Sequence, residues 1–379
     1  MHAALVHMRH AATGGTERYL NQVALHLAER GDLVTIVCRS HEDAPDPRVR
    51  FASLRPLAVG PAMRMTSFAR AVERHVRERS YDVVYGLGKT WTHDVVRLGG
   101  GCHQTYLERM GGEVRHKDRL AIGIESRALA TDSCLRVVVN SRRVGEDVAR
   151  RHGIAADRIR LVYNGVDLGR FHPRARTGAG AALRRSIGIG EDDVAILFLG
   201  SGYRRKGLDL ALEAFRRISG SIGTARLVVV GRDSDEARYR GLAADAGLGD
   251  RVRFLGARDD AESCFAAADL FVLPTRYDPF ANATLEALAS GLPVITSEDN
   301  GASELVVEGW NGSVLPVLGA DALAETLRAW CDRERLRAAS PCARETAERH
   351  PVAEKGAQTA AILDEVVAWK AAERPVARP

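Results

Sequence analysis

The sequence lacks the features that mark several large classes of protein. Its six cysteines form no C-x-x-C pair and stand beside no histidine cluster, so neither a disulfide scaffold nor a zinc site is expected. No run of about eighteen apolar residues is present to cross a membrane. The sequence has no polybasic tail, which argues against nucleic-acid binding. It also has no G-x-G-x-x-G motif of the kind that marks dinucleotide oxidoreductases.

The composition is typical of a soluble globular protein with room for two domains. Of the 379 residues, 45% are hydrophobic and 27% are charged, and the formal net charge is +5. A mildly basic chain suits a phosphate-bearing substrate or an anionic membrane surface. The segment from Met1 to His7 lacks the long apolar core of a signal peptide and instead predicts a first strand. The cytoplasm is therefore the expected compartment.

Short β-branched runs alternate with helical patterns in two successive series, which predicts parallel sheets built from βαβ units. The expected strands are Ala3–Met8, Leu33–Cys38, Asp82–Leu87, Val95–Leu98, Leu135–Val139, Ile159–Val162, Val194–Leu199, Arg226–Val230, Val252–Leu255, Leu270–Leu273 and Pro293–Thr296.

We therefore predict an α/β protein with two doubly wound, Rossmann-like domains that face each other across a cleft. The first covers residues 1–172 and the second residues 173–352. Residues 353–379 are expected to form a helix that returns to the first domain, followed by a tail. In such sheets ligands bind beyond the carboxyl ends of the strands, which is where three motifs fall.

The first motif is Thr13–Arg18, directly after the first strand. Gly14 and Gly15 allow a ligand close to the backbone, and the next helix offers unpaired N–H groups to a phosphate or a sugar oxygen. An ordinary strand-to-helix turn explains the motif equally well.

The second motif is Gly200–Gly207, which contains three consecutive cations, Arg204, Arg205 and Lys206. It lacks the spacing of a Walker phosphate loop. Crowded cations at the mouth of a sheet favour an anionic ligand such as a diphosphate over a solvated basic turn.

The third motif, Asp278–Ile295, is the most specific. Asn282 is expected to be the N-cap of a helix whose N-terminus can hold negative charge or sugar hydroxyls. Asp278 precedes this helix and Glu286 lies one turn inside it, so the two carboxylates are placed to grip one polyhydroxyl ligand. A solvent-facing Glu286 is the alternative.

In this order the three motifs resemble the retaining glycosyltransferases of the glycogen-synthase and phosphatidylinositol-mannosyltransferase type (family 4), which have the GT-B fold. Within that family the chain is similar to the bacterial lipopolysaccharide core glucosyltransferases. Three further segments also match: Val162–Asp167, Gly301–Leu305 and Glu308–Gly312.

The resemblance implies roles for residues at matching positions. Arg205 and Lys206 would neutralise the donor diphosphate, Glu286 would bind the ribose, and Asp278 would face the donor sugar. Gly14 and Gly15 would approach the diphosphate from the first domain, and Arg258 would lie at the nucleobase. The remaining donor-binding positions at the helix N-terminus are Phe280, Ala281, Asn282 and Ala283.

Three residues depart from the family pattern. Asp278 occupies a position where the family has Glu, and Ala281 a position where it has Gly. Gly100 occupies a position where related sequences often carry an acidic residue. His103 is the nearest polar candidate to touch the donor sugar or the acceptor, although a structural histidine is the commoner case. Lys89, Thr90 and His93 are candidates for the acceptor side.

The predicted function is transfer of a hexosyl group, with retention, from a nucleoside-diphosphate sugar such as UDP-glucose to a saccharide, lipid-linked or natural-product acceptor. No Asp-x-Asp motif is evident, so no metal and no other cofactor is expected. The alternatives are a non-catalytic sugar-nucleotide-binding partner subunit and a nucleotide-sugar epimerase or hydrolase.

The segment Met63–Arg79 places Met65, Phe68, Val72 and Val76 on one helical stripe beside several arginines. Peripheral contact with the inner face of an anionic cell membrane is one interpretation. A helix that packs on the sheet is the other, and the commoner one.

Overall fold

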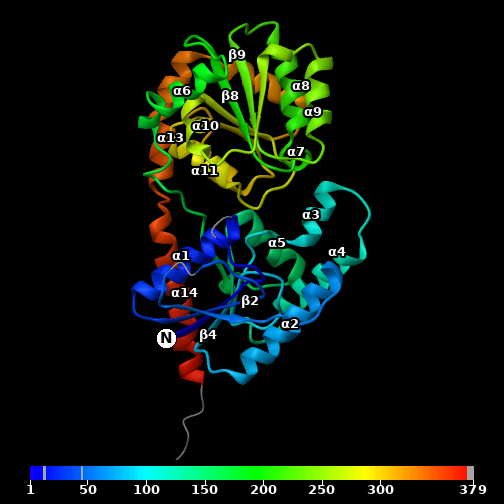
Figure 1. Ribbon diagram of the computed structural model, residues 1–379, viewed down its shortest axis with the longest axis vertical. Coiled ribbons are helices and arrows are strands. Elements are labelled where there is room, and N and C mark those ends of the chain that lie inside the picture. The colour runs from blue at the N-terminus through cyan, green and yellow to red at the C-terminus, as the bar shows by residue number, and fades with distance from the viewer. Residues whose placement is uncertain (12–13, 44–45, 374–379) are drawn as a thin grey trace, which may run out of the picture. The chain divides into compact units, whose positions relative to one another are not determined.

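The computed structural model describes residues 1–11, 14–43 and 46–373, which divide into two compact units. Unit 1 contains Met1–Asn164 and the C-terminal segment from Val352 onward; unit 2 is Gly165–Pro351. The division after Asn164 lies upstream of the boundary expected at residues 172 and 173. Two described α/β units, each with a parallel sheet, bear out the predicted fold class (Figure 1).

Unit 1 is built on a seven-stranded sheet, counted over the described residues, with the order β3-β2-β1-β4-β5-β6-β7. Its strands are β1 (His2–Val6), β2 (Leu33–Cys38), β3 (Val49–Ser53), β4 (Val83–Gly86), β5 (Val95–Arg97), β6 (Arg136–Val139) and β7 (Ile159–Leu161). Its helices are α1 (Gly15–Glu29), α2 (Gly60–Glu78), α3 (His103–Met110), α4 (His116–Ala130), α5 (Arg142–His152), the 3-10 turn η1 (Ala156–Arg158) and α14 (Val352–Glu373).

Strand β1 is buried on both faces, because its alternate side chains enter two different hydrophobic clusters. Ala3 and Leu5 pack with helices α1 and α14, whereas Ala4 and Val6 pack with α2. Figure 1 shows α1 with α14 on one side of this sheet and α2 with α4 on the other. Gly31, at φ +94°, follows the end of α1 in the left-handed region that favours glycine.

Helix α14 is joined to unit 1 by both apolar and polar contacts. Leu363 and Val366 are buried in the cluster that contains α1. The Tyr19 hydroxyl lies 2.6 Å from Thr359 Oγ1. Arg30 donates two hydrogen bonds to the carboxylate of Asp364, at 2.5 and 2.9 Å. The last helix therefore completes the core of the unit that begins the chain.

Unit 2 is built on a six-stranded sheet, again counted over described residues, with the order β10-β9-β8-β11-β12-β13. Its strands are β8 (Val194–Leu199), β9 (Ala225–Val230), β10 (Val252–Gly256), β11 (Leu270–Leu273), β12 (Val294–Ser297) and β13 (Gly312–Leu315). Its helices and 3-10 turns are η2 (Pro173–Arg176), α6 (Ala179–Ser186), α7 (Tyr203–Lys206), α8 (Leu208–Ser219), α9 (Glu236–Asp245), η3 (Gly249–Arg251), α10 (Ala261–Ala267), α11 (Asn282–Ala289), η4 (Gly301–Leu305), α12 (Ala320–Trp330) and α13 (Arg333–Glu348).

The sequence prediction missed two strands, and each lies at an edge of its sheet. Strand β3 pairs only with β2, and β13 pairs only with β12, among the described strands. Edge strands have one partner and carry mixed side chains such as Arg50 and Ser313, so they lack the continuous apolar run of a central parallel strand.

The apolar stripe of helix α2 packs against other side chains of unit 1. Phe68 and Val72 are buried, and Met65 and Val76 pack against buried clusters. This bears out packing on the sheet as the role of the stripe. Within the described part of the chain, no helix combines the length and the apolar content needed to cross a bilayer.

Candidate functional site

The short helix α7 carries Arg205 and Lys206 at the carboxyl end of β8. It is bounded by Gly202 and Gly207, at φ +78° and +80°, conformations that favour glycine. A Cβ atom on Gly207 would lie 2.0 Å from the carbonyl oxygen of Pro274. Glycine at this position therefore lets the basic segment approach the end of strand β11 closely.

Residues that follow β11 hold this segment by its backbone. The carbonyl oxygen of Arg205 accepts hydrogen bonds from Thr275 Oγ1 at 2.9 Å and from the backbone N–H of Arg276 at 2.8 Å. The guanidinium of Arg276 also makes a two-armed ion pair with Asp209 in α8, at 2.8 and 2.7 Å. These contacts fix the position from which the two cations extend.

The structure brings three predicted residues together through one oxygen atom. Asp278 Oδ2 accepts a hydrogen bond from Lys206 Nζ at 2.6 Å and another from Arg205 Nη1 at 2.7 Å. Asp278 Oδ1 accepts the backbone N–H of Phe280 at 3.1 Å. Asp278 thus contacts two of the three cations of the basic motif, a relationship that the sequence did not reveal.

Burial and charge act in opposite directions on this cluster. Burial lowers the pKa of Lys206, whereas the neighbouring Asp278 opposes that change. Burial acts to raise the pKa of Asp278, but Lys206 and Arg205 outweigh it and hold the pKa below its usual value. The carboxylate is therefore ionised at neutral pH. Two basic side chains share this one carboxylate, so the three groups together carry one net positive charge while Lys206 is protonated.

The N-terminus of helix α11 is organised by a residue that the sequence prediction missed. Asn300 is fully buried, and its Oδ1 accepts the backbone N–H groups of Ala281 and Ala302, each at 3.1 Å. Its Nδ2 donates to Thr284 Oγ1 at 2.9 Å and to Thr296 Oγ1 at 3.0 Å. The turn residues around Asn300 were the only local signal, because its partners Ala281 and Thr284 come from another segment.

The prediction that Asn282 is the N-cap of this helix was wrong by one residue. Ala281 is the N-cap and Asn282 is the first helical residue. Ala281 makes no side-chain cap, and its own backbone N–H is accepted by Asn300 Oδ1 from across the loop. Ala281 has φ −73°, which any residue adopts, so Ala in place of Gly causes no backbone strain here.

The remaining donor-side candidates of unit 2 lie along the same edge of the sheet. Phe280 is buried, whereas Ala283 and Glu286 are half-buried on α11. Glu286 lies close enough to Lys206 to influence its pKa, through attraction of opposite charges. Arg258 is exposed after strand β10, and both arms of its guanidinium bond to Asp260, at 2.8 and 2.7 Å.

The candidate residues of unit 1 at the start of α1 are exposed glycines. Gly14 has φ +113°, and Gly15 is the first residue of the helix; Thr13 lies outside the described residues. Glu17, one turn further on, lies 3.8 Å from the imidazole of His7. Burial lowers the pKa of His7, the largest of several influences on it.

A cavity of about 390 Å³ lies in unit 1 beyond the carboxyl ends of β1, β4 and β5. Lys89, Thr90 and Gly100 are among its lining residues, beside apolar side chains such as Met65 and Ile124. This is the edge where open α/β sheets bind ligands, and two of the three acceptor-side candidates line it.

His103 and His93 lie elsewhere in unit 1. His103 begins α3, and its Nε2 is 3.1 Å from Asp118 Oδ1. Its Nδ1 is 3.4 Å from Lys89 Nζ. His93 is buried at 2% exposure, burial lowers its pKa to about 4, and it lines a separate cavity with Lys370. His93 is thus in a different place from Lys89 and Thr90 because its side chain points into the packed interior.

Comparison with known proteins assigns the chain to a family. Residues 13–170 match the model described as Glycosyltransferase Family 4, and residues 181–344 match Glycosyl transferases group 1. A D-inositol 3-phosphate glycosyltransferase of Mycobacterium tuberculosis (strain ATCC 25177 / H37Ra) is 30% identical over 341 residues, which cover 80% of this chain and 68% of that protein. The chain belongs to the GT-B glycosyltransferases of these families.

One further relative and two solved structures resemble this glycosyltransferase over different shares of its length. An uncharacterized glycosyltransferase of Methanocaldococcus jannaschii, MJ1607, is 29% identical over 59% of this chain, a match that spans 57% of that protein's length. The crystal structure of WaaG, a glycosyltransferase involved in lipopolysaccharide biosynthesis, has a TM-score of 0.82 at 23% identity, covering 95% of this chain and 99% of that chain. Anabaena Alr3699/HepE in complex with UDP-glucose has a TM-score of 0.73 at 19% identity, covering 96% of this chain and 100% of that chain.

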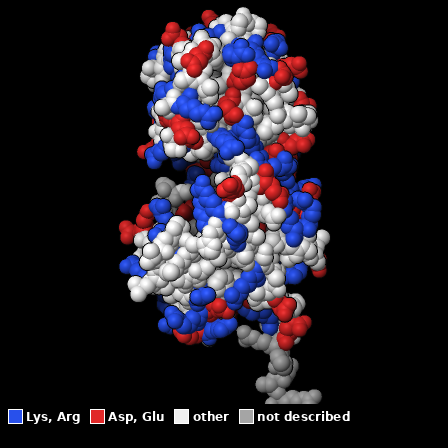
Figure 2. All heavy atoms as spheres, turned by 90° about the vertical axis from the view of Figure 1, so that its right-hand side faces the viewer, with Lys and Arg blue, Asp and Glu red and all other residues white. Residues whose placement is uncertain are grey.

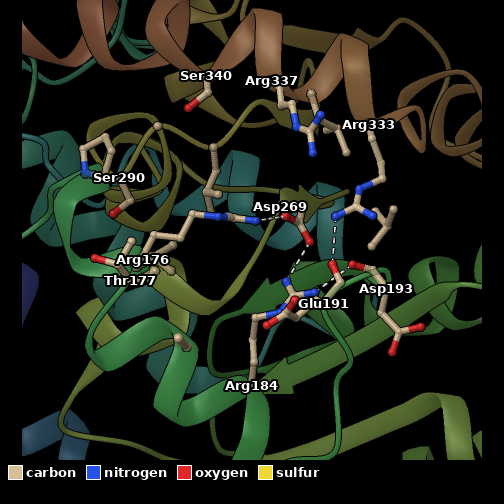
Figure 3. Close-up of a pocket in the computed structure, with 18 of the residues that line it drawn as sticks. Arg176, Thr177, Arg184, Glu191, Asp193, Asp269, Ser290, Arg333, Arg337 and Ser340 are labelled. Carbon is tan, nitrogen blue, oxygen red and sulfur yellow. Dashed lines mark hydrogen bonds and ion pairs between the residues drawn. The ribbon is translucent and has the colours of Figure 1, made fainter.

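The glycosyltransferase also has a cavity of about 580 Å³ at the opposite, amino edge of the unit 2 sheet, where β8 begins at Val194 (Figure 3). Figure 3 shows Arg176 and Arg184 directed toward the carboxylate of Asp269. These arginines are already paired, and the basic cluster of Arg205 and Lys206 lies at the other end of the same strand. Over the face shown in Figure 2, basic and acidic side chains are interspersed on each unit.

Proposed function

We propose that this glycosyltransferase moves a hexosyl group, with retention of anomeric configuration, from a UDP-hexose of the UDP-glucose type. The observation that carries the proposal is the cluster of Arg205, Lys206 and Asp278 beyond strand β8, with Glu286 beside it. A buried lysine and a guanidinium offer cationic hydrogen-bond donors that suit the oxygens of a diphosphate. The complex of HepE with UDP-glucose supports this choice of donor.

In the proposed reaction the charge that develops on the departing nucleoside diphosphate is stabilised by fixed groups. Arg205 and Lys206 face the phosphate oxygens, and the N-terminus of α11 adds backbone N–H donors. Thr275, Arg276 and Asn300 hold these groups in place before the donor arrives, so little reorganisation is needed. The basic side chains take the part that a divalent cation plays in metal-dependent transferases, and no metal is required at this site.

The proposed role of Asp278 changes with the observed geometry. A side chain that faced only the donor sugar would leave the two cations to repel each other. Instead, Asp278 holds Lys206 and Arg205 by one oxygen, and we propose that it sets their spacing while the donor sugar lies nearby. Glu286 would bind the ribose hydroxyls. Retention would follow from attack by the acceptor on the leaving-group side of the sugar.

The acceptor side is assigned to unit 1. Lys89, Thr90 and Gly100 line its cavity, and His103 is linked to it through Lys89. A saccharide, a lipid-linked sugar or a natural product is the proposed acceptor, and inositol phosphate joins the panel because of the M. tuberculosis relative. Peripheral membrane contact stays a prediction. It would use the exposed Leu57, Val59 and Met63 in place of the packed stripe of α2.

The test is a turnover assay over a panel of nucleoside-diphosphate sugars and acceptors, with released nucleoside diphosphate and product mass as readouts. We expect consumption of a UDP-hexose and a product of retained configuration by NMR. A protein that binds UDP but consumes no donor with any acceptor would instead be a non-catalytic partner subunit. Donor hydrolysis or epimerisation without transfer would instead indicate a nucleotide-sugar hydrolase or epimerase.

A further inference from the structure

Three potential metal ligands of different chemistry meet in unit 1. Cys102 directly precedes α3, Glu125 lies in α4, and His152 is the last residue of α5. The thiol sulfur, a carboxylate oxygen and an imidazole nitrogen all lie within 4.8 Å of one another. Among the described residues these three form the only such group that could hold a metal ion.

The spacing is close to that of a coordinated ion. Zinc bonds of about 2.0–2.3 Å to nitrogen, oxygen and sulfur place tetrahedral ligands roughly 3.5 Å apart. His152 Nε2 already lies 3.3 Å from Glu125 Oε1. The other two separations are at most 4.8 Å, so binding one ion requires them to shorten by no more than about 1.3 Å.

Burial and charge around the cluster favour a cation. Cys102 is fully buried, and the side chains of Glu125 and His152 are only 11% and 13% exposed. Burial raises the pKa of the Cys102 thiol well above its usual range, and the charges of Glu125 and Asp147 raise it further. A thiol among carboxylates stays protonated on its own, whereas a bound dication would reverse that balance.

We propose that Cys102, Glu125 and His152 bind one thiophilic divalent cation, best matched by Zn²⁺, with water as the fourth ligand. Binding forms bonds from the metal to sulfur, oxygen and nitrogen, and the Cys102 thiol proton passes to solvent. A set of sulfur, imidazole and carboxylate selects zinc over magnesium or calcium, which prefer oxygen ligands. A site with three protein ligands keeps an open position.

The ion would connect the acceptor-side cavity to its supporting helices. Glu125 lines the cavity, and its carboxylate accepts the backbone N–H of His103 at 3.1 Å. A metal that holds Glu125 to Cys102 and His152 would fix the start of α3 against α4 and α5. The proposal concerns unit 1 alone and does not depend on the donor chemistry of unit 2.

The test uses the full chain, stripped of metal with a chelator under reducing conditions and titrated with Co²⁺. We expect one equivalent to bind, with a near-ultraviolet thiolate-to-cobalt charge-transfer band that Zn²⁺ abolishes. Cys102→Ser should remove the band. The matched control is Cys38→Ser, another buried thiol of unit 1 that lies outside the group, and it should keep the band.

A second variant covers the case in which Cys102→Ser does not fold. His152→Ala changes a partly exposed side chain at a helix end, so we expect it to fold. Loss of a direct ligand should weaken Zn²⁺ binding by more than the ~10–100-fold typical of outer partners. A charge-transfer band that survives Cys102→Ser, less than one equivalent bound, or unchanged Zn²⁺ affinity in His152→Ala would each overturn the proposal.

Discussion

Lys206 Nζ donates a hydrogen bond to Asp278 Oδ2 at 2.6 Å, and both residues are more than nine-tenths buried. Lys206 ends helix α7 after strand β8, and Asp278 lies in the loop after the adjacent strand β11. The pair holds the lysine ammonium group in a buried position at the carboxyl-terminal edge of the unit 2 sheet. Few water molecules surround it there, so its attraction for an incoming phosphate is stronger.

Replacing Lys206 should weaken nucleoside diphosphate binding much more than replacing its neighbour. Lys206→Ala removes a charge-assisted contact worth ~1.5–3 kcal/mol, so we expect the Kd for UDP to rise about 10- to 150-fold by calorimetry. The matched control is Arg204→Ala, in the same helix but exposed. Equal losses in the two variants would mean that the motif acts only through its overall charge.

Asp278→Asn should destabilise unit 2, because it leaves two cations without their carboxylate. Removal of one partner of a buried ion pair costs ~3–5 kcal/mol, and loss of the Lys206 proton would moderate this cost. Chemical denaturation measures the change. Asp192→Asn, at a side chain 94% exposed, is the control and should cost less than ~0.5 kcal/mol.

The stability deficit of Asp278→Asn should depend on pH in a defined direction. The folded-state pKa of Asp278 lies below its unfolded value of about 3.9, so its ionised form stabilises the fold fully above that pH. This contribution is lost as pH falls through the folded pKa. We therefore expect the difference in unfolding free energy from wild type to shrink as the solution becomes more acidic than about pH 5. A difference that grows with acidity would contradict the assignment.

Asn300→Ala should disturb both stability and donor binding. The change leaves two backbone N–H groups and two threonine hydroxyls without their buried partner, so we expect a loss of at least ~2 kcal/mol. Asn311→Ala is a matched control, since Asn311 is equally buried but bonds around Leu305, Val307 and Thr346. Both variants should lower stability, but only Asn300→Ala should weaken UDP binding.

Chelation separates the proposed metal site from the proposed donor site. UDP affinity should be unchanged after treatment with EDTA, because Arg205 and Lys206 carry the charge that balances the diphosphate. Calorimetry on chelated protein, with and without added Mg²⁺, measures this directly. A requirement for Mg²⁺ would refute metal independence and leave the Cys102 site untouched.

Much of the fold followed from local sequence patterns. The central strands were predicted because their β-branched apolar runs are a property of a few consecutive residues. The edge strands β3 and β13 were missed, since their pairing depends on a neighbouring strand more than on their own composition. For the same reason Asn282 was predicted as an N-cap, whereas the acceptor for that helix end comes from Asn300, on a different loop.

The sequence by itself determined the order of strands and helices and the motifs that follow the strands, because these depend on contacts between near neighbours along the chain. Only the tertiary structure decided that one oxygen of Asp278 holds both Arg205 and Lys206, and that Cys102, Glu125 and His152 meet. Such groups arise when packing brings together side chains from distant segments, and their geometry is fixed by the core beneath them.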